Sequence, residues 1–378
     1  MTPSPVAADG APLRVLLTTP NLGVGGAERV VVELANGLQA RGDTVAVAAA
    51  PGPLEAGLDD AVERIVLPET ARSFAATAAV APRLARELRA FRPDAIHTQN
   101  VKSTVVAGTA ARLASPVGRR AKVIATFHGV TPGEVRTGAR LLRLADEVVS
   151  VSSDLAQALD GAGFPPARSV VIENAVPAPP PLSAERSQAL TRELSLEGAQ
   201  VVCAVGRLVA QKAHDRFVAA AALVARQEPG ARFLILGEGA LRAGLEAQIE
   251  QLGLGGRVTL AGVRDDAREV IALADLVVFS SDWEGLSLVA LEALAAGTPV
   301  VATDVAGMRD LLGGGAGALA ESLTPEALAD QILALLRDPV RRATMGARGR
   351  ELIESRFSLD GMVEAYRVRY KRLAARAA

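Results

Sequence analysis

Short apolar segments alternate with helical patterns along almost the whole chain. The segments are rich in Val, Leu, Ile and Ala and lack polar alternation, as expected of parallel strands that helices cover on both faces. Strand–helix–strand repetition of this kind predicts a doubly wound α/β architecture. We predict strands at residues 14–18, 44–48, 95–98, 122–127, 147–152 and 169–172, and again at 200–205, 232–236, 257–260, 276–280 and 299–303.

A proline-rich segment, Val-Pro-Ala-Pro-Pro-Pro-Leu at residues 176–182, lies between the two series of strands. Four prolines in seven residues cannot continue a helix or a central strand, so the segment is predicted to be a linker. We expect two Rossmann-like domains at 1–178 and 179–357, with a C-terminal helix in 358–378 that packs on or crosses back to the first. A ligand is expected at the carboxyl ends of the two parallel sheets.

The first predicted strand leads into the glycine-rich segment 20–28, Pro-Asn-Leu-Gly-Val-Gly-Gly-Ala-Glu, and then into a predicted helix at 27–40. Backbone amides at such a turn can approach a phosphate, which makes Gly25 and Gly26 candidate ligand contacts. The alternative is a tight turn that needs glycine dihedrals. Glu28 occupies the third glycine position of the dinucleotide fingerprint, and the second strand ends without an acidic residue, so we reject an NAD-dependent dehydrogenase.

A pair of carboxylates marks the segment 280–297. Ser287 is a plausible N-cap and Gly297 a plausible C-terminal glycine, which predicts a helix at 288–296. That helix is apolar on every side except at Glu292, so it should be buried, and Glu292 needs hydrogen-bond donors. A ribose diol would supply two; the alternative is local backbone. Glu284 precedes the helix, whose first amides can face ligand oxygens.

Two cations follow the first strand of the second half: Arg207, directly after Gly206, and Lys212. Their place after a parallel strand aims them at the carboxyl end of the sheet, where they would stabilise a leaving diphosphate. The chain has no Asp-x-Asp sequence and no His/Cys/Asp cluster at metal-ligand spacing. We therefore expect no metal and no cofactor, and we expect the two cations to neutralise phosphate charge in place of a metal.

These motifs together resemble the retaining nucleotide-sugar glycosyltransferases of family 4, also called group 1, which have the GT-B fold. Glu284 and Glu292, with Gly-Leu-Ser between them, match the family's carboxylate motif, and the chain departs from its pattern where Ala213 and Ala175 replace glycine. The other matching segments are Gly-Gly-Ala-Glu at 25–28, Gly-Arg-x4-Lys at 206–212, Thr-Phe-His-Gly at 126–129 and Ile-Glu-Asn-Ala-Val at 172–176.

The resemblance implies a role for each matching residue. On the donor side, it places Glu292 on the ribose, Arg207 and Lys212 on the diphosphate, and Glu284 on the sugar. The backbone amides of Gly285, Leu286 and Ser287 join Glu284 there. In the first domain, the Gly25–Gly26 loop and His128 would close over the donor near the reacting centre. Independently of the resemblance, polar residues at strand ends tend to line a ligand cleft, so His97, near the end of the predicted strand 95–98, is a weaker candidate for an acceptor contact. Asn174 is a second weak candidate for the acceptor, and His214 receives no role.

The activity that the resemblance implies is metal-independent transfer of a hexose or N-acetylhexosamine to a hydroxyl acceptor, with retention of anomeric configuration. A UDP-sugar is our first choice of donor, and a GDP-mannose-dependent mannosyltransferase is an alternative. Two further alternatives are a nucleotide-sugar epimerase of similar fold and a non-catalytic subunit. Three classes of acceptor are expected: a small molecule, a saccharide or a lipid-linked compound.

Charge and hydropathy bear on partners and location. A net charge of −1 gives no field that attracts nucleic acid. The N-terminus lacks a signal-peptide pattern, and apolar runs fall short of a spanning helix, so we expect a cytoplasmic protein. A basic run in the first half could contact the inner membrane face or a phosphorylated acceptor: Arg112, Arg119, Arg120, Lys122, Arg136, Arg140 and Arg143.

Overall fold

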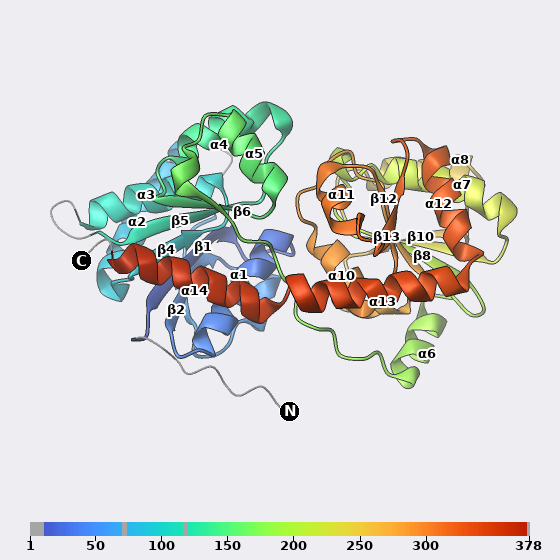
Figure 1. Ribbon diagram of the computed structural model, residues 1–378, viewed down its shortest axis with the longest axis horizontal. Coiled ribbons are helices and arrows are strands. Elements are labelled where there is room, and N and C mark those ends of the chain that lie inside the picture. Colours follow the sequence, from blue (N-terminus) through green and yellow to red (C-terminus); the bar gives the residue numbers. More distant parts are fainter. Residues whose placement is uncertain (1–10, 70–73, 116–119, 376–378) are drawn as a thin grey trace. The chain divides into compact units, whose positions relative to one another are not determined.

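The computed structural model describes residues 11–69, 74–115 and 120–375, and the chain forms two compact units (Figure 1). The first unit is Met1–Asn174 together with Leu359–Ala378, and the second is Ala175–Ser358. The sequence predicts boundaries after residues 178 and 357, and the chain passes between the units after Asn174 and after Ser358. Each unit is an α/β fold around one parallel sheet.

The first unit has seven parallel strands in the order β3-β2-β1-β4-β5-β6-β7. Helices follow most strands, and the last helix of the chain, α14, belongs to this unit. The strands are β1 (Arg14–Asn21), β2 (Thr44–Ala50), β3 (Glu63–Val66), β4 (Ala95–Thr98), β5 (Lys122–Phe127), β6 (Glu147–Ser150) and β7 (Ser169–Val171). The helices are α1 (Gly26–Gln39), α2 (Phe74–Phe91), α3 (Val101–Ala114), α4 (Val135–Leu142), α5 (Ser153–Gly161) and α14 (Leu359–Ala375).

The second unit has six parallel strands in the order β10-β9-β8-β11-β12-β13. The strands are β8 (Gln200–Val205), β9 (Ala231–Leu236), β10 (Val258–Gly262), β11 (Leu276–Phe279), β12 (Val300–Thr303) and β13 (Gly317–Ala320). The helices are α6 (Ala184–Glu193), α7 (His214–Gln227), α8 (Arg242–Gln251), α9 (Ala267–Leu273), α10 (Leu288–Ala296), α11 (Ala306–Leu312), α12 (Pro325–Leu336) and α13 (Pro339–Arg356).

Both faces of the second sheet are buried, as the uninterrupted apolar runs predict. Along β8, Val202 and Ala204 belong to one core cluster, while Val201 and Cys203 belong to another. Because successive side chains of a strand point to opposite faces, these two clusters lie on the two faces of the sheet. The burial of Cys203 raises the pKa of its thiol to about 12, so it is a small core residue and not a reactive one.

The helix α14 is attached to the first unit by ion pairs and by buried tyrosines. Arg367 pairs with the buried Asp43 (Nε–Oδ2 2.8 Å), and Arg369 pairs with Glu147 through Nε and Nη2. Tyr366 on the same helix is fully buried. In Figure 1, α14 (red) lies beside α1 and β4 of the first unit.

Candidate functional site

Two loops of the second unit follow neighbouring strands at the point where the strand order of the sheet reverses. The loop 206–213 follows β8, and the loop 280–287 follows β11, which is the neighbour of β8. In open α/β sheets such a switch point, at the carboxyl ends of the strands, is where ligands bind. The two loops contain most of the donor-side residues that the sequence singles out.

Hydrogen bonds join these two loops directly. The Ser280 hydroxyl donates to the Lys212 carbonyl (2.9 Å), and the Asp282 amide donates to the Gln211 carbonyl (2.9 Å). The Gln211 side-chain amide donates to the carbonyl of Trp283 (3.1 Å). The loops therefore form one hydrogen-bonded structure, although 72 residues separate Gln211 from Trp283 in sequence.

An ion pair between Lys212 and Glu284 lies within this structure. The Lys212 Nζ is 2.5 Å from Glu284 Oε1, and the Ser281 hydroxyl donates to the same oxygen at 2.6 Å. The Glu284 side chain is only 5 % exposed, whereas Arg207 is exposed. A carboxylate this deeply buried is stable because a cation and a hydroxyl face it.

The turn after Lys212 has a left-handed residue that is not glycine. Ala213 has φ 43° and ψ 48°, and it precedes the first residue of α7. This is the position where the resemblance leads us to expect glycine. An alanine in the left-handed region costs about 1 to 2 kcal/mol, so the turn holds a conformation that glycine would adopt with less strain.

The helix α10 begins and ends where the sequence predicts. Ser287 accepts a hydrogen bond from the Ala290 amide as the N-cap, and Gly297 ends the helix with φ 78°. Glu292 is buried, and its Oε1 accepts from Nε of Arg268 on α9 at 2.7 Å. The predicted need for donors is therefore met in part by an arginine that the sequence reasoning missed.

Two glycines allow backbone segments of the site to approach closely. A Cβ on Gly237, whose φ is 147°, would overlap the carbonyl oxygen of Gly206. A Cβ on Gly307, at the start of α11, would overlap the carbonyl oxygen of Gly285. Larger residues at these positions would displace the loops that bear Arg207 and Glu284.

His214 lies directly behind the cation loop. It is buried at the first turn of α7, and burial and the neighbouring Lys212 lower its pKa to about 4. The carbonyls of Gly206 and Arg207 oppose this shift. His214 is therefore a neutral residue of the loop's interior at pH 7.

The glycine loop of the first unit connects β1 to α1 at the reversal of strand order in its own sheet. Gly25 is the N-cap of α1 with extended backbone, and Gly26 is the first helical residue. The Gly23 amide donates to the side chain of Asn21 at 3.1 Å, which closes the turn. The amides at this helix N-terminus are the groups that the predicted phosphate contact would use.

His128 follows β5 and belongs to a hydrogen-bonded group of side chains in the first unit. Its Nε2 is 2.9 Å from Oε1 of Gln99, the residue after β4. Partial burial lowers the pKa of His128 to about 4, so the ring is neutral at pH 7. A neutral imidazole can contact a sugar by a hydrogen bond but adds no positive charge to the site.

The structure corrects our expectation for His97. Its side chain is fully buried, with Nδ1 2.7 Å from the Tyr370 hydroxyl and Nε2 2.6 Å from the Thr126 hydroxyl. Both ring nitrogens are used inside the unit, so a direct acceptor contact is not available. The error came from treating every polar residue at a strand end as lining the surface. Asn174 is also buried, at 3 % exposure.

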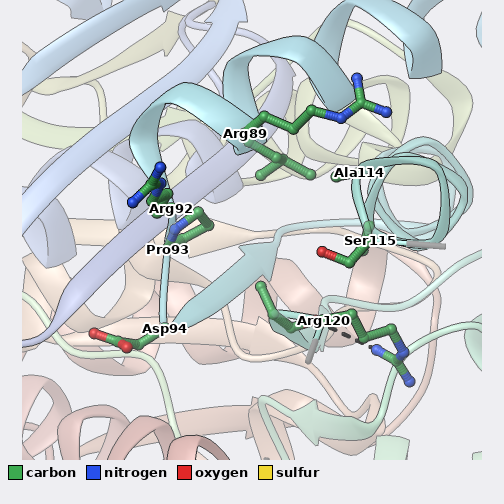
Figure 2. Close-up of a pocket in the computed structure, with 10 residues that line it drawn as sticks. Arg89, Arg92, Pro93, Asp94, Ala114, Ser115 and Arg120 are labelled. Atoms are coloured by element: carbon green, nitrogen blue, oxygen red, sulfur yellow. Dashed lines mark hydrogen bonds between the residues drawn. The ribbon is translucent and has the colours of Figure 1, made fainter. Parts of the chain in front are cut away.

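A cavity of about 500 Å³ lies at the opposite end of the first sheet, between the ends of α2 and α3. Arg89, Arg92 and Arg120 line it, but Figure 2 shows their side chains directed away from one another. Arg89 donates to the Leu113 carbonyl, and Arg120 forms a bidentate pair with Asp146. Arg89 thus binds a carbonyl at the end of α3, and Arg120 binds a neighbouring carboxylate. The arginine side chains that line the cavity do not converge on a ligand.

Several residues of the predicted basic run are likewise engaged within the fold. Arg112 donates to the Gly108 carbonyl, and Arg143 donates to the Gly163 carbonyl. Arg136 and Arg140 are exposed on α4, and Arg119 lies outside the described residues. In the described part of the chain, no helix has the length and hydropathy to span a bilayer. Those same residues contain no group of three His, Cys, Asp or Glu side chains placed to hold a metal.

Two family models match the chain. Residues 24–178 match the model described as Glycosyltransferase Family 4, and residues 187–352 match Glycosyl transferases group 1. The first match ends at residue 178, within the proline-rich segment, and the second begins after that segment. Together they contain the predicted site residues described above.

Curated relatives match at moderate identity. A GDP-mannose-dependent alpha-(1-6)-phosphatidylinositol monomannoside mannosyltransferase of Mycobacterium tuberculosis is 30% identical over 285 residues, 68% of this chain and 72% of that protein. A D-inositol 3-phosphate glycosyltransferase of Segniliparus rotundus is 38% identical over 187 residues, 46% of this chain. That match covers 41% of the relative, so the chain spans less than half of its length.

Solved structures are similar over nearly the full chain. The crystal structure of Anabaena Alr3699/HepE in complex with UDP and glucose superimposes with a TM-score of 0.83 at 22% identity, covering 95% of this chain and 99% of that one. WaaG, a glycosyltransferase involved in lipopolysaccharide biosynthesis, superimposes with a TM-score of 0.74 at 19% identity. At these identities the likeness concerns the fold.

Proposed function

We propose that this chain, which belongs to the family of group 1 glycosyl transferases and has the GT-B fold, moves a hexosyl or N-acetylhexosaminyl group from a nucleoside-diphosphate sugar to a hydroxyl acceptor. The observation that carries the proposal is the buried Lys212–Glu284 pair at the reversal of strand order in the second sheet. A cation and a carboxylate are fixed there by neighbouring loops, next to the capped N-terminus of α10.

The charges of the second-unit site suit a diphosphate. The proposed donor site contains three cations, Arg207, Lys212 and Arg268. It contains two carboxylates, Glu284 and Glu292, so the formal charge of these five residues is +1. A pyrophosphate at this end of the sheet would gain charge-assisted hydrogen bonds from Arg207 and Lys212. The amides at the start of α10 would add to them through the helix dipole. In this assignment the neutralisation needs no metal.

Glu292 is assigned to the ribose of the donor. Its carboxylate is buried on α10, and its contact with Arg268 involves Oε1. A vicinal diol offers two hydroxyl donors at the spacing of a carboxylate, so ribose hydroxyls would bind in place of or beside Arg268. Arg268 is 40 % exposed, which allows its side chain to turn into solvent when the diol binds.

The chemical step assigned to this site is substitution at the anomeric carbon on the same face as the leaving group. The bond from carbon to the diphosphate oxygen breaks as Arg207 and Lys212 stabilise the charge that develops on that oxygen. The leaving phosphate takes the proton of the acceptor hydroxyl, and the acceptor oxygen bonds to the anomeric carbon with retention. Glu284 is assigned to the sugar hydroxyls in the second unit, which orients the donor, and His128 is the sugar contact that the resemblance assigns to the first unit.

A UDP-sugar is the donor that we propose first. The Anabaena structure is a complex with UDP and glucose, and it has the fold of this chain. A specific observation supports GDP-mannose as the second candidate. The relative that this chain covers to 72% is GDP-mannose-dependent by name. The exposed arginines of α4 suit a phosphorylated or lipid-linked acceptor, which would place the enzyme at the inner face of the membrane.

The Glu284→Gln substitution tests the proposed chemistry. The variant should bind the nucleotide diphosphate nearly as well as the wild type, because Glu284 is assigned to the sugar. It should transfer at least ~100-fold more slowly, which corresponds to about 2.7 kcal/mol of transition-state stabilisation. Release of nucleotide diphosphate with appearance of a glycosylated acceptor is the assay.

Glu246→Gln is the matched control, since Glu246 is an exposed carboxylate in an ion pair on α8, outside both loops. It should transfer at the wild-type rate. Wild-type turnover of the Glu284→Gln variant would refute the assignment. Conversion of the donor to its epimer with no acceptor product would instead favour a nucleotide-sugar epimerase.

A further inference from the structure

A chain of hydrogen bonds leads from the surface residue His128 to the interior of the first unit. His128 Nε2 is 2.9 Å from Gln99 Oε1, and Gln99 Nε2 is 3.3 Å from Nε2 of His97. Gln99 is fully buried, and its backbone amide donates to the Thr18 carbonyl of β1 at 3.2 Å. The Gln99 side chain thus has its oxygen toward one histidine and its nitrogen toward the other.

The inner end of this chain is fixed by α14. The Tyr370 hydroxyl is 2.7 Å from His97 Nδ1, and the Tyr366 ring lies over His97 with centroids 4.8 Å apart. The Tyr366 hydroxyl is 3.0 Å from the Thr126 hydroxyl, which in turn contacts His97 Nε2. These side chains are buried, so His97 has little freedom to rotate.

The order of donors and acceptors determines where the protons lie. The Gln99 amide nitrogen can only donate, and it lies 3.3 Å from His97 Nε2, whereas the Thr126 hydroxyl, 2.6 Å from the same nitrogen, can donate to it as well. With Nε2 as the acceptor of both groups, His97 carries its proton on Nδ1, facing Tyr370. The Gln99 oxygen can only accept, so the proton of His128 must be on Nε2. Burial keeps both rings neutral, with pKa values of about 3 for His97 and about 4 for His128. The remaining nitrogen of His128, Nδ1, is then an acceptor.

We propose that Gln99, oriented by the buried His97–Tyr370 pair, is a positioning residue that fixes His128 as the Nε2–H tautomer. In this state His128 presents Nδ1 as an acceptor for a ligand hydroxyl. The role of His128 toward the donor sugar rests on the function proposed above, whereas the tautomer is a property of the protein by itself. The helix α14 then contributes to the site through buried hydrogen bonds, without touching substrate.

Nitrogen-15 NMR of histidine-labelled full-length protein tests the proposal directly. The chain has three histidines, so a His128→Asn variant identifies the His128 signals by their loss. At pH 7.5 the wild type should show His128 as neutral and protonated on Nε2. In Gln99→Met, which keeps the length but removes both hydrogen-bonding groups, His128 should become a mixture of tautomers.

Two further variants separate positioning from a general loss of packing. Gln99→Glu keeps the acceptor for His128 and should retain the Nε2–H tautomer. Tyr370→Phe removes only the hydroxyl that contacts His97 and should shift the tautomers of both histidines. The matched control is Thr191→Val on α6 of the second unit, which removes a hydroxyl that donates to the Ser187 carbonyl outside this network, and it should leave the His128 tautomer unchanged.

Kinetics give the second readout. Gln99→Met should lower kcat on the order of 10-fold to 100-fold, because a misplaced contact at the reacting centre is costly. The Kd for nucleotide diphosphate should stay unchanged, since its ligands belong to the second unit. An Nδ1–H tautomer in the wild type, or an unchanged His128 spectrum in Gln99→Met, would overturn the proposal. Absence of transfer by the wild type would refute the proposed function and leave the tautomer result standing.

Discussion

Substitution of Glu292 by glutamine isolates the proposed contact with ribose. Glutamine has the same shape, keeps one acceptor oxygen and replaces the other by an NH2 donor that faces a hydroxyl. Glu292 is 6 % exposed in its side chain, and Arg268, its partner, is 40 % exposed. Because Arg268 can be solvated after the change, the second unit should lose no more than about 1 kcal/mol of stability.

The expected loss of affinity follows from the hydrogen bonds. Hydrogen bonds to a charged group contribute about 1.5 to 3 kcal/mol, against about 1 kcal/mol for neutral ones, so losing one and weakening the other costs about 2 kcal/mol. The competing contact with Arg268 offsets up to about 1 kcal/mol of this. We therefore expect the Kd for a nucleoside diphosphate to rise roughly 5- to 30-fold, which is about 1 to 2 kcal/mol.

The protein carries its own reporter for this measurement. Trp283 is the only tryptophan of the chain and lies in the loop 280–287, where its carbonyl accepts from Gln211. Its fluorescence should change when nucleotide binds. Titration of wild type and Glu292→Gln with UDP and with the 2′,3′-dideoxy analogue then gives a double-mutant cycle between the carboxylate and the diol.

The cycle has a defined outcome. Removing the diol should weaken binding to the wild type and have little further effect on Glu292→Gln, since both changes remove the same contacts. Glu269→Gln, which alters an exposed ion-paired carboxylate on α9, serves as the control and should bind both ligands as the wild type does. Equal losses for UDP and its dideoxy analogue would show that Glu292 acts elsewhere and refute the ribose assignment.

Two further predictions concern stability. The pKa values of His97, His128 and His214 are lowered to about 3, 4 and 4. Between pH 6.5 and about 4 the unfolded chain therefore binds more protons. The contribution of these histidines to the free energy of unfolding is complete above pH 6.5. Below pH 6.5 the free energy of unfolding should fall by about 1.4 kcal/mol per pH unit for each histidine. Urea unfolding at pH 7.5 and 5 checks this, and equal stability at both would contradict it. Lys212→Met leaves the buried Glu284 carboxylate without its cation and should destabilise the second unit by about 2 to 3 kcal/mol. The double variant Lys212→Met/Glu284→Gln should recover at least half of that loss of stability. Unfolding followed by tryptophan fluorescence tests it, and a cost below about 0.5 kcal/mol would show that the pair is solvated.

Local sequence patterns were sufficient for the framework of the fold. Ser287 and Gly297 predict the bounds of α10, because capping depends on residues next to the helix end. The apolar runs predict most strands, since helices bury both faces of a central parallel strand. They miss two edge strands: β3, in which only Ile65 is buried, and β13, where three of the four residues are Gly or Ala.

Contacts between residues far apart in the sequence could not be predicted from local patterns. Arg268 and Glu292 lie on different helices, and the local sequence around either residue does not predict that they form an ion pair. His97 was expected at the surface because it ends a strand. Its burial depends on Tyr370, 273 residues away, and only the return of α14 to the first unit brings the two together. The signal that was available is that both tyrosines of the chain lie on this one helix.

The central claim is that the second unit binds a nucleoside-diphosphate sugar without a metal. The most direct test measures the thermal stability of the full chain, by Trp283 fluorescence, against UDP-, GDP-, ADP- and dTDP-sugars in EDTA, with NAD as control. Ligand at about 100 times its Kd adds about 2.7 kcal/mol, which should raise the unfolding midpoint by roughly 5 to 11 °C. The account predicts such a shift with one nucleotide-sugar class, UDP-sugars first, unaffected by EDTA. No shift with any of them, or a shift with NAD alone, would contradict it.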